Sequence, residues 1–468
     1  MKIQFLGAAQ EVTGSKHLIT TQSGKTILLD CGMYQGKGME TDAANRELGF
    51  DPKDIHYLLL SHAHIDHSGL IPYIYSLGFR GKIFCTPATR DLCELMLQDT
   101  AFIQEQDVRW YNKKMHRQHK PTIKPLFDTH HAQQVMKLFR TVDYNTTYRI
   151  DNEISFQFIN SGHMLGSALI HLSIQEHNEV KRIAYTGDIG RLHSHILSTP
   201  QPFPQCDYLI CESTYGDRLH DDELVSEEQL LGVVEETCMY KKGKLLIPSF
   251  SVGRTQEIVY VLNELYNDGR LERVPVYVDS PLSANATEIF RRYADTLNEQ
   301  VRDTMRFDSD PFGFNTLRYI TDLKDSKALN RSQEPCIVIS ASGMLEAGRI
   351  KHHVSNHIDD PSTTILIVGY CTPTSLGARI QNPDLRYVSI FGYDHRIRAQ
   401  VTKIEGFSGH GDYQEMIQYF TGCQDVKQVR KVFVVHGESQ SQEAMKDHLY
   451  EAGFRGIMIP AKGEEFEV

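Results

Sequence analysis

The chain has 468 residues, of which 40% are hydrophobic and 23% charged, and its 49 Lys and Arg against 60 Asp and Glu give a net charge of −11. These values exclude a disordered, collagen-like or coiled-coil chain and predict a globular protein of two or three domains. No apolar run approaches the roughly 18 residues of a membrane span, no secretory signal opens the chain, and the nine cysteines form no Cys-x-x-Cys pair, which favours reduced thiols. We therefore expect a soluble, cytoplasmic protein with no membrane partner.

The first part of the chain is predicted to be rich in short strands. Apolar runs bounded by Gly, Ser, Asn or Asp are typical of strands, whereas the longer stretch at residues 87–106 predicts an amphipathic helix. The predicted strands cover residues 2–6, 17–20, 26–30, 56–60, 154–159, 169–174, 182–185 and 207–211.

From about residue 223 helices and near-continuous apolar strands alternate, which is typical of a parallel sheet covered on both faces. The predicted helices are 223–240 and 255–267, the predicted strands are 244–247, 275–278, 336–340 and 363–370, and residues 306–313 are expected to form an irregular loop. The remaining elements, at 413–420, 429–435, 441–452 and 456–459, are too few for an independent domain. We therefore interpret the middle part as an insertion into the first domain.

The segment Ser-His-Ala-His-Ile-Asp-His-Ser-Gly at residues 61–69 places three histidines and one aspartate directly after a predicted strand. Imidazole and carboxylate are the ligands that Zn²⁺ takes where no thiolate is present. A loop at a strand end can aim His62 and His64 at one point while Asp66 and His67 face another, so one segment can serve two metal ions. A histidine-rich surface loop is the alternative, and the dense spacing disfavours it.

Four further residues with ligand chemistry stand next to a glycine, or two positions before one, at the ends of other predicted strands. They are Asp30, His163, Asp188 and His436. Taken singly, an Asp or His at such a position is more often a turn residue. Because all four share this placement, we expect them to converge with the histidine-rich loop.

Together with that loop, these positions resemble the metallo-β-lactamase fold, and four more segments resemble the hallmarks of the β-CASP nucleases, above all their compact bacterial members. The segments are Cys-Glu-Ser-Thr-Tyr-Gly at 211–216, Pro-Ser-Phe-Ser-Val-Gly-Arg at 248–254, Phe-Ser-Gly-His-Gly-Asp at 407–412 and His-Gly-Glu at 436–438. The resemblance covers essentially the whole chain. It implies an α/β protein: a metallo-β-lactamase αββα sandwich built from residues 1–212 and 403–468, with an inserted β-CASP α/β domain, its sheet mostly parallel, at 213–402.

The resemblance also implies the ligands of two zinc ions per chain. One ion would be held by His62, His64 and His163 and the other by Asp66, His67 and His436, with Asp188 bridging both. Asp30 would orient a ligand histidine by accepting the hydrogen of its other ring nitrogen.

For catalysis the resemblance implies His410, Glu212 and Asp66. Two zinc ions roughly 3.5–4 Å apart can lower the pKa of a shared water to about 7 and stabilise the charge on a phosphoryl group under attack, so hydroxide is the expected nucleophile. His410 would protonate the departing alkoxide, and Glu212 would orient His410 and raise its pKa. The segment around His410 commonly reads Ser-Ala-His-Ala-Asp in the family and reads Ser-Gly-His-Gly-Asp here. The expected reaction is hydrolysis of RNA to 5′-phosphate and 3′-hydroxyl ends; His436 favours RNA because DNA-specific relatives carry an apolar residue there.

Two regions are candidates for RNA binding. Residues 109–124 contain six basic side chains, Trp110 and Tyr111, and no acidic residue, a combination that suits a groove for nucleic acid, although a solvated helix end is the alternative. The candidates in this strip are Arg109, Lys113, Lys114 and Arg117. Loops that follow predicted strands of the insert could present backbone N–H groups to phosphates or simply cap helices, and their candidates are Ser251, Arg254, Ser342 and Thr374.

Two other functions compete with a zinc-dependent ribonuclease. A hydrolase of small thioesters or lactams is disfavoured by the insert at 213–402, which such enzymes lack, and a non-catalytic RNA-binding relative is disfavoured by the intact ligand set. Endonucleolytic or 5′-exonucleolytic action, the target transcripts and a homodimer all stay open.

Overall fold

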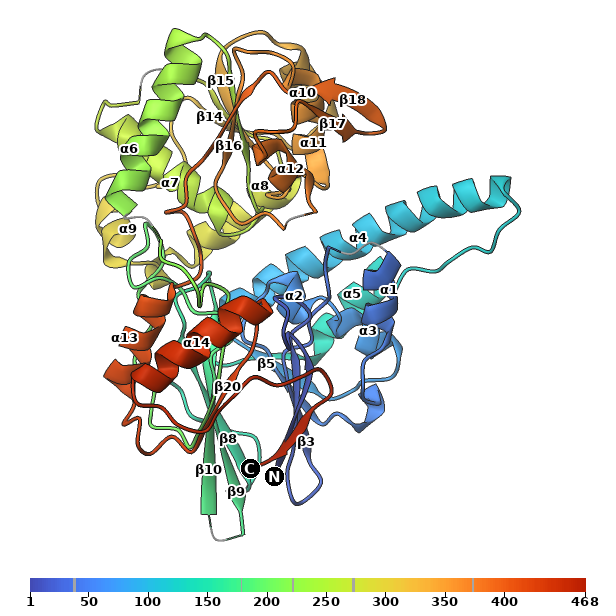
Figure 1. The fold of residues 1–468 in the computed structure, drawn as a ribbon, viewed down its shortest axis with the longest axis vertical. Coiled ribbons are helices and arrows are strands. Elements are labelled where there is room, and N and C mark those ends of the chain that lie inside the picture. Colours follow the sequence, from blue (N-terminus) through green and yellow to red (C-terminus); the bar gives the residue numbers. More distant parts are fainter. Residues whose placement is uncertain (37–38, 178, 221–222, 272–273, 373) are drawn as a thin grey trace. The chain divides into compact units, whose positions relative to one another are not determined.

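The computed structural model describes residues 1–468 except 37–38, 178, 221–222, 272–273 and 373 (Figure 1). It divides into two compact units. Unit 1 comprises residues 1–192, 199–219 and 410–468, and unit 2 comprises residues 193–198 and 220–409. The chain passes from unit 1 to unit 2 at 219/220 and returns at 409/410, some seven residues after each domain boundary expected from the sequence. The short stretch 193–198 also belongs to unit 2, although no feature of the sequence indicated it.

Two seven-stranded sheets form the centre of unit 1. The first has the order β22-β1-β2-β3-β4-β5-β6, and the second has the order β21-β20-β11-β10-β9-β8-β7. The strands of the first sheet are β1 Lys2–Gly7, β2 Lys16–Thr20, β3 Thr26–Leu29, β4 Tyr57–Leu59, β5 Lys82–Cys85, β6 Phe139–Thr141 and β22 Glu465–Glu467. Those of the second are β7 Tyr148–Arg149, β8 Ile154–Asn160, β9 Ala168–Glu176, β10 Glu179–Tyr185, β11 Tyr208–Cys211, β20 Lys431–Val434 and β21 Ile457–Met458.

The side chains of the central strands alternate between two hydrophobic layers. In β11, Tyr208 and Ile210 point into the layer between the two sheets, whereas Leu209 and Cys211 pack with the outer helices. Because both faces of such a strand are covered, it reads in the sequence as a continuous apolar run. The outer helices are α1 Met39–Arg46, α2 Ile65–Ser68, α3 Ile71–Ser76, α4 Pro87–Arg117, α5 Thr129–Val135, α13 Tyr413–Cys423 and α14 Ser439–Glu451. The αββα sandwich predicted from the resemblance is confirmed.

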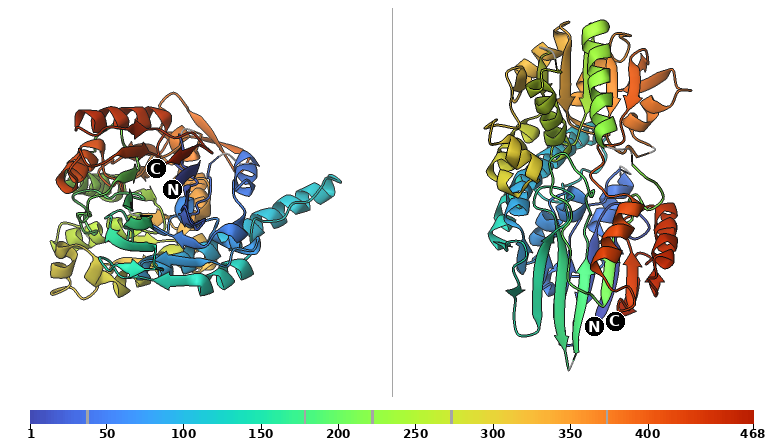
Figure 2. Two further views of the ribbon diagram at one scale, coloured as in Figure 1. Left: turned by 90° about the horizontal axis from the view of Figure 1, so that it is seen from below. Right: turned by 90° about the vertical axis from the view of Figure 1, so that its left-hand side faces the viewer.

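Unit 2 is built on a six-stranded sheet of order β14-β13-β15-β12-β16-β19, in which every pairing is parallel. Helices α10, α11 and α12 pack against one face of this sheet, and Figure 2 shows further helices on the opposite face. The strands are β12 Lys244–Pro248, β13 Val276–Val278, β14 Leu317–Tyr319, β15 Cys336–Ser340, β16 Thr364–Ile367 and β19 Gln400–Lys403, beside the hairpin β17 Tyr387–Ile390 and β18 Tyr393–Arg396. The helices are α6 Glu223–Val234, α7 Arg254–Asn267, α8 Pro281–Arg292, α9 Glu299–Thr304, α10 Leu323–Arg331, α11 Gly348–His357 and α12 Leu376–Gln381. The predicted parallel, doubly covered sheet is confirmed.

Helix α4 is longer than the pattern at residues 87–106 predicted, because it continues to Arg117 as one helix of 31 residues. Its first half buries Leu92 and Leu97, whereas its second half is largely exposed and so lacks the apolar periodicity used for the prediction. Basic side chains in the last turn, among them Lys114 and Arg117, favour this end through the helix dipole. Among the described residues, no helix combines the length and apolarity needed to cross a membrane.

Candidate metal centre

The histidine-rich loop runs from the end of β4 into the short helix α2 and rests against the segment that follows β3. The N–H of Cys31 donates to the carbonyl of His67 at 2.7 Å, and the N–H of Met33 donates to the carbonyl of Ile65 at 2.9 Å. A Cβ atom on Gly32 would lie 1.5 Å from the carbonyl oxygen of Asp66, so only glycine fits between these bonds. The backbone of the loop is therefore fixed by packing as well as by its own turn.

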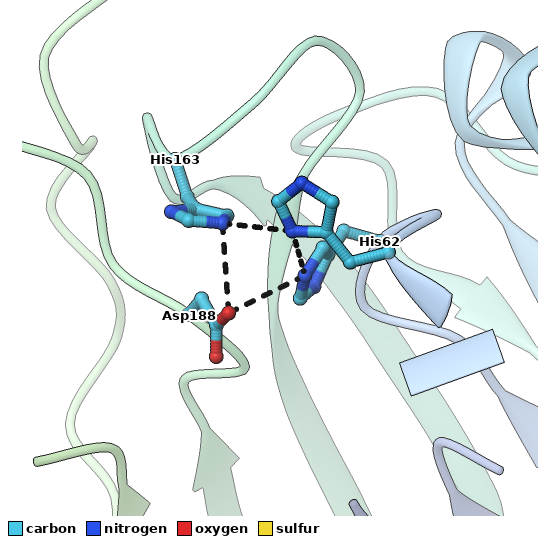
Figure 3. A group of neighbouring side chains, drawn as sticks. His62, His163 and Asp188 are labelled. Atoms are coloured by element: carbon cyan, nitrogen blue, oxygen red, sulfur yellow. Dashed lines mark hydrogen bonds and ion pairs between the residues drawn. The ribbon is translucent and has the colours of Figure 1, made fainter. Parts of the chain in front are cut away.

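Four donor atoms converge in a first cluster (Figure 3). Nδ1 of His64 lies 3.1 Å from Nε2 of both His62 and His163, and Oδ2 of Asp188 lies 3.4 Å and 3.5 Å from the same two Nε2 atoms. Ligands of a tetrahedral zinc ion at 2.0–2.1 Å are about 3.3 Å apart. The spacing of these four atoms therefore fits one zinc ion.

A second cluster shares Asp188 with the first. Nε2 of His67 lies 3.2 Å from Asp188 Oδ1 and 3.1 Å from Nε2 of His436, which in turn lies 3.5 Å from Oδ2 of Asp66. The two carboxylate oxygens of Asp188 thus face different clusters. This is the arrangement that a bridging ligand requires.

Asp30 holds His67 from behind the second cluster. It occupies the left-handed region at φ 57°, and its Oδ2 accepts a hydrogen bond from Nδ1 of His67 at 2.6 Å. The N–H and hydroxyl of Ser61 and the hydroxyl of Tyr185 also donate to Asp30, each at 2.7 Å. With Nδ1 engaged in this way, Nε2 of His67 faces the cluster. Tyr185 is not predicted from the sequence, because its only signal is one hydroxyl at the end of a predicted strand.

The charges in the centre suit a divalent cation. Burial lowers the pKa values of His62 and His163, and it lowers that of His64 to about 3. These imidazoles are therefore neutral and keep a lone pair for a metal. Burial alone would raise the pKa of Asp188, but His436 and His67 beside it lower that pKa well below its ordinary value. Among the described residues, Asp188 Oδ1 is buried without a hydrogen-bond partner. An ionised carboxylate beside the three neutral imidazoles of the first cluster is a donor set that zinc binds. Burial alone would lower the pKa of His67, but Asp188 and Asp30 raise it well above its ordinary value, so this imidazole would give up its proton when it binds a metal.

A histidine–carboxylate pair lies beside the first cluster. Nδ1 of His410 is 3.1 Å from both carboxylate oxygens of Glu212, and the ring of His410 lies 4.5 Å, between centroids, from that of His163. Backbone N–H groups of Ile189 and Thr214 donate to Glu212 and fix its position. Burial alone would lower the pKa of His410, but the charge and hydrogen bond of Glu212 raise it to about 9. A partly exposed imidazolium of this kind can donate a proton near neutral pH.

The glycines that flank His410 do not leave its loop unanchored. The N–H of Gly411 donates to the carbonyl of Ile189 at 2.9 Å, and Asp412 caps helix α13 in a capping box with Glu415. These contacts anchor the two residues that directly follow His410. The Ser-Gly-His-Gly-Asp variant of the motif is therefore held in place by hydrogen bonds.

The basic strip at residues 109–124 occupies the end of α4 and the loop that follows it. Lys113, Lys114 and Arg117 are exposed, Arg109 pairs with Glu105 at 3.2 Å, and Lys114 lies 5.7 Å from the ring centroid of Trp110. Trp110 is itself 68% exposed. The strip thus offers both charge and an aromatic face to solvent.

In unit 2 the three candidate loops follow neighbouring strands β15, β12 and β16, so they gather at the carboxyl edge of its sheet. Three of the four candidate side chains there already have partners in the fold. Arg254 pairs with Glu257 at 3.0 Å, and the hydroxyl of Ser342 bonds to the backbone of Ala347 within its own loop. Ser251 lies 3.5 Å from the hydroxyl of Ser280, and Thr374 is exposed.

The αββα sandwich and its donor cluster define the class of protein as a metallo-hydrolase of the metallo-β-lactamase superfamily. Family models agree along the chain: the metallo-β-lactamase superfamily matches residues 14–231, the Beta-Casp domain matches 255–380, and the Zn-dependent metallo-hydrolase RNA specificity domain matches 394–460. The chain belongs to the β-CASP family of this superfamily.

Full-length relatives support this membership. Ribonuclease TTHA0252 of Thermus thermophilus is 34% identical over 468 residues, covering 99% of this chain and 97% of its own length. The RNase J-like protein of Methanocaldococcus jannaschii is 32% identical, covering 98% of each chain, and transcription termination factor FttA of the same organism is 33% identical over 94% of this chain and 67% of its own length. A solved protein of unknown function from Enterococcus faecalis V583 shares the fold, with a TM-score of 0.53 at 13% identity over 99% of each chain.

Proposed function

We propose that this protein is a metal-dependent ribonuclease that hydrolyses RNA phosphodiester bonds with two zinc ions, leaving 5′-phosphate and 3′-hydroxyl ends. The observation that carries the proposal is the pair of donor clusters joined through Asp188, with the His410–Glu212 pair beside them. The relatives named as a ribonuclease and as RNase J-like support RNA as the substrate.

His62, His64 and His163 would hold one zinc ion, and Asp66, His67 and His436 the other, with Asp188 contributing one oxygen to each. The chemistry that two bound zinc ions supply is a hydroxide nucleophile at neutral pH and positive charge for the phosphoryl group under attack. Asp30 fixes the ring of His67 through its Nδ1 hydrogen, and the hydroxyl of Thr214, 3.1 Å from Nδ1 of His436, has the same effect on that ring.

His410 would supply the proton that the leaving 3′-oxygen needs. An alkoxide is strongly basic, so its departure is slow unless a proton reaches it as the bond breaks. Glu212 engages Nδ1 of His410 and raises its pKa to about 9, which leaves Nε2 as the atom that donates. Asp66 would contribute to catalysis as a ligand of the second zinc ion.

End-labelled RNA tests the proposal directly. Zinc-loaded protein is incubated with one RNA labelled separately at its 5′ and 3′ ends, with DNA of the same sequence, and with a small nitrocefin-type lactam and a thioester. We expect cleavage of RNA alone, loss of activity in a chelator and recovery when zinc returns. Turnover of the small substrates without RNA cleavage would instead identify a small-molecule hydrolase, and RNA binding without any cleavage would identify a non-catalytic relative.

We further propose that the protein acts in the cytoplasm. All nine cysteines are free, and seven of them are buried. Reduced thiols are the ordinary state in a reducing compartment. The homodimer that the sequence left open is tested by light scattering of the zinc-loaded protein.

A further inference from the structure

Unit 2 contains a groove of about 570 Å³ between helices α10 and α11, and none of its residues belongs to the candidate metal centre. A volume of this size is typical of sites for ligands larger than a single ion. The side chains that matter for its chemistry are Lys327, Arg331, Arg349, His352, Asn356 and Asp360.

The lining of the groove is cationic although the chain as a whole carries a charge of −11. Lys327 and Arg331 are exposed, and no ion pair involves them within the described part of the chain. Arg349 is neutralised by the buried Asp279 at 2.7 Å, and Asp360, the single acid among the lining residues, accepts hydrogen bonds from Ser362. Asp360 keeps its negative charge, but Lys327 and Arg331 outnumber it, so the lining has a net positive charge, which suits an anionic ligand.

The charges of the groove also act on one another. Burial lowers the pKa of His352, and the neighbouring His353, Lys327 and Lys351 lower it further. Positive groups from both helices thus crowd together around one opening. An anion placed there would relieve their mutual repulsion.

An aromatic rim adjoins the groove. The ring of Phe391 stacks on His352 with centroids 4.6 Å apart, and Nζ of Lys351 lies 5.4 Å from the centroid of Phe391. Phe391 is 50% exposed and Tyr393, two residues further on, is 74% exposed. Such exposed rings beside positive charge are typical of surfaces that bind single-stranded nucleic acid.

The hairpin β17–β18 places this rim by its own turn. Phe391 and Gly392 have φ angles of 54° and 82°, as in the type I′ turn that suits a tight hairpin. Val388 and Ile390 are buried and anchor the hairpin on the core of unit 2, while Figure 1 shows β17 and β18 projecting from that unit. The aromatic rings at the tip are therefore held in solvent by a fixed scaffold.

We propose that the groove and its aromatic rim bind a short stretch of single-stranded RNA. Phosphates would lie against Lys327 and Arg331, and a base would stack on Phe391 or Tyr393. Double-stranded RNA keeps its bases stacked inside the helix, so the exposed rings favour a single strand. The inference rests on the proposed function, since it takes RNA as the substrate, and it gives unit 2 a binding surface in addition to the loops at the carboxyl edge of its sheet.

Binding of a fluorescent single-stranded RNA of twelve nucleotides to zinc-loaded protein tests the groove by anisotropy, with the His410→Asn background used if the wild type cleaves the probe. The groove variant carries Lys327→Ala with Arg331→Ala. Its matched control carries Lys324→Ala, on the same helix but outside the groove, with Arg318→Ala, another exposed position of unit 2.

Each lost phosphate contact removes about 0.7 from the slope of log affinity against log salt for a single strand. For the two contacts of the groove variant, we expect this slope to decrease by about 1.4. Between 50 and 200 mM salt, the loss of affinity of the variant should therefore be about sevenfold smaller than that of the wild type. The control variant should keep the slope of the wild type. Phe391→Leu should weaken binding at least about fivefold, and Phe391→Tyr should restore it, because a stacked base requires an aromatic face.

Equal slopes in the groove variant and the control would overturn the proposal. The proposal would also be overturned if AMP displaced the RNA completely at concentrations near the dissociation constant of AMP itself, because the groove would then bind a free nucleotide. Hydrolysis of a nitrophenyl phosphodiester and the unfolding temperature, both unchanged in the groove variant, show that the fold and the metal centre are intact. If the wild type cleaves no RNA but the groove variant still loses slope, the proposed function fails while the groove stands.

Discussion

Replacing His410 separates proton donation from metal binding. His410→Asn keeps a polar side chain of similar size but removes the group that titrates, and it changes no residue of the two clusters proposed to bind zinc. Because a positioned general acid accelerates a reaction by about 10²–10⁴-fold, we expect the variant to lose that much in RNA cleavage while it retains two zinc ions. A matched His130→Asn variant, in which an exposed histidine of α5 is changed, should behave as the wild type.

Glu212→Gln tests the same residue through its pKa. With a pKa of about 9, His410 is about 90% protonated at pH 8, whereas an ordinary histidine with a pKa of about 6.5 is about 3% protonated at that pH. Removing the carboxylate should therefore lower the rate at pH 8 by up to about thirtyfold and move the alkaline limb of the pH profile to lower pH. Near pH 6 the loss should be small, because His410 is then largely protonated in both proteins.

The assay compares two substrates on preparations whose zinc content is measured. One is RNA, whose leaving alkoxide needs a proton. The other is a phosphodiester with a nitrophenol leaving group, which departs without one. Hydrolysis of the nitrophenyl ester should fall far less than that of RNA. Equal losses on both substrates, or loss of a zinc ion, would refute the acid role and indicate that His410 positions the scissile phosphate.

Three other predictions follow from the structure. Asp188→Asn should weaken both zinc ions, whereas His163→Ala should disturb chiefly one, and a replete Asp188→Asn protein that keeps two zinc ions by elemental analysis contradicts the bridging role. A variant in which Lys113, Lys114 and Arg117 of the α4 strip are changed to alanine should bind RNA more weakly, and the slope of log affinity against log salt should fall by about 0.7 per contact. Anisotropy titrations that match those of the wild type would contradict this role. Burial lowers the pKa of His17 to about 3, so only the unfolded chain binds this proton as pH falls below about 6.5, and the free energy of unfolding should drop by about 2 kcal/mol at pH 5. His17 lies between the rings of Phe5 and Tyr185, and His17→Phe should remove this part of the difference in stability between urea unfolding at pH 7.5 and at pH 5. An unchanged difference would mean that His17 does not stay neutral.

The sequence by itself determined the local half of the candidate site. His62, His64, Asp66 and His67 lie within one loop and one helical turn, so their spacing restricts where they can point, whatever the rest of the chain does. The parallel sheet of unit 2 was equally readable, because strands covered on both faces leave continuous apolar runs. The helix at α4 was only partly readable, since its exposed half has no apolar face to reveal it.

Tertiary structure alone decided which distant residues meet. Asp30, His163, Asp188 and His436 lie on separate strand ends, and only the packing of the two sheets of unit 1 brings their oxygen and nitrogen atoms to within hydrogen-bonding range of the loop. The hydrogen bond from the hydroxyl of Tyr185 to Asp30 could not be predicted from the sequence for the same reason. Likewise, the groove of unit 2 lies between α10 and α11, and the β17–β18 turn adjoins it only through the stacking of Phe391 on His352; each of these segments by itself shows only an ordinary amphipathic pattern. A periodic pattern in the sequence indicates which face of a helix or strand is buried, but not which other element covers that face. Contacts between distant segments depend on which element covers the face, so only the tertiary structure determines them.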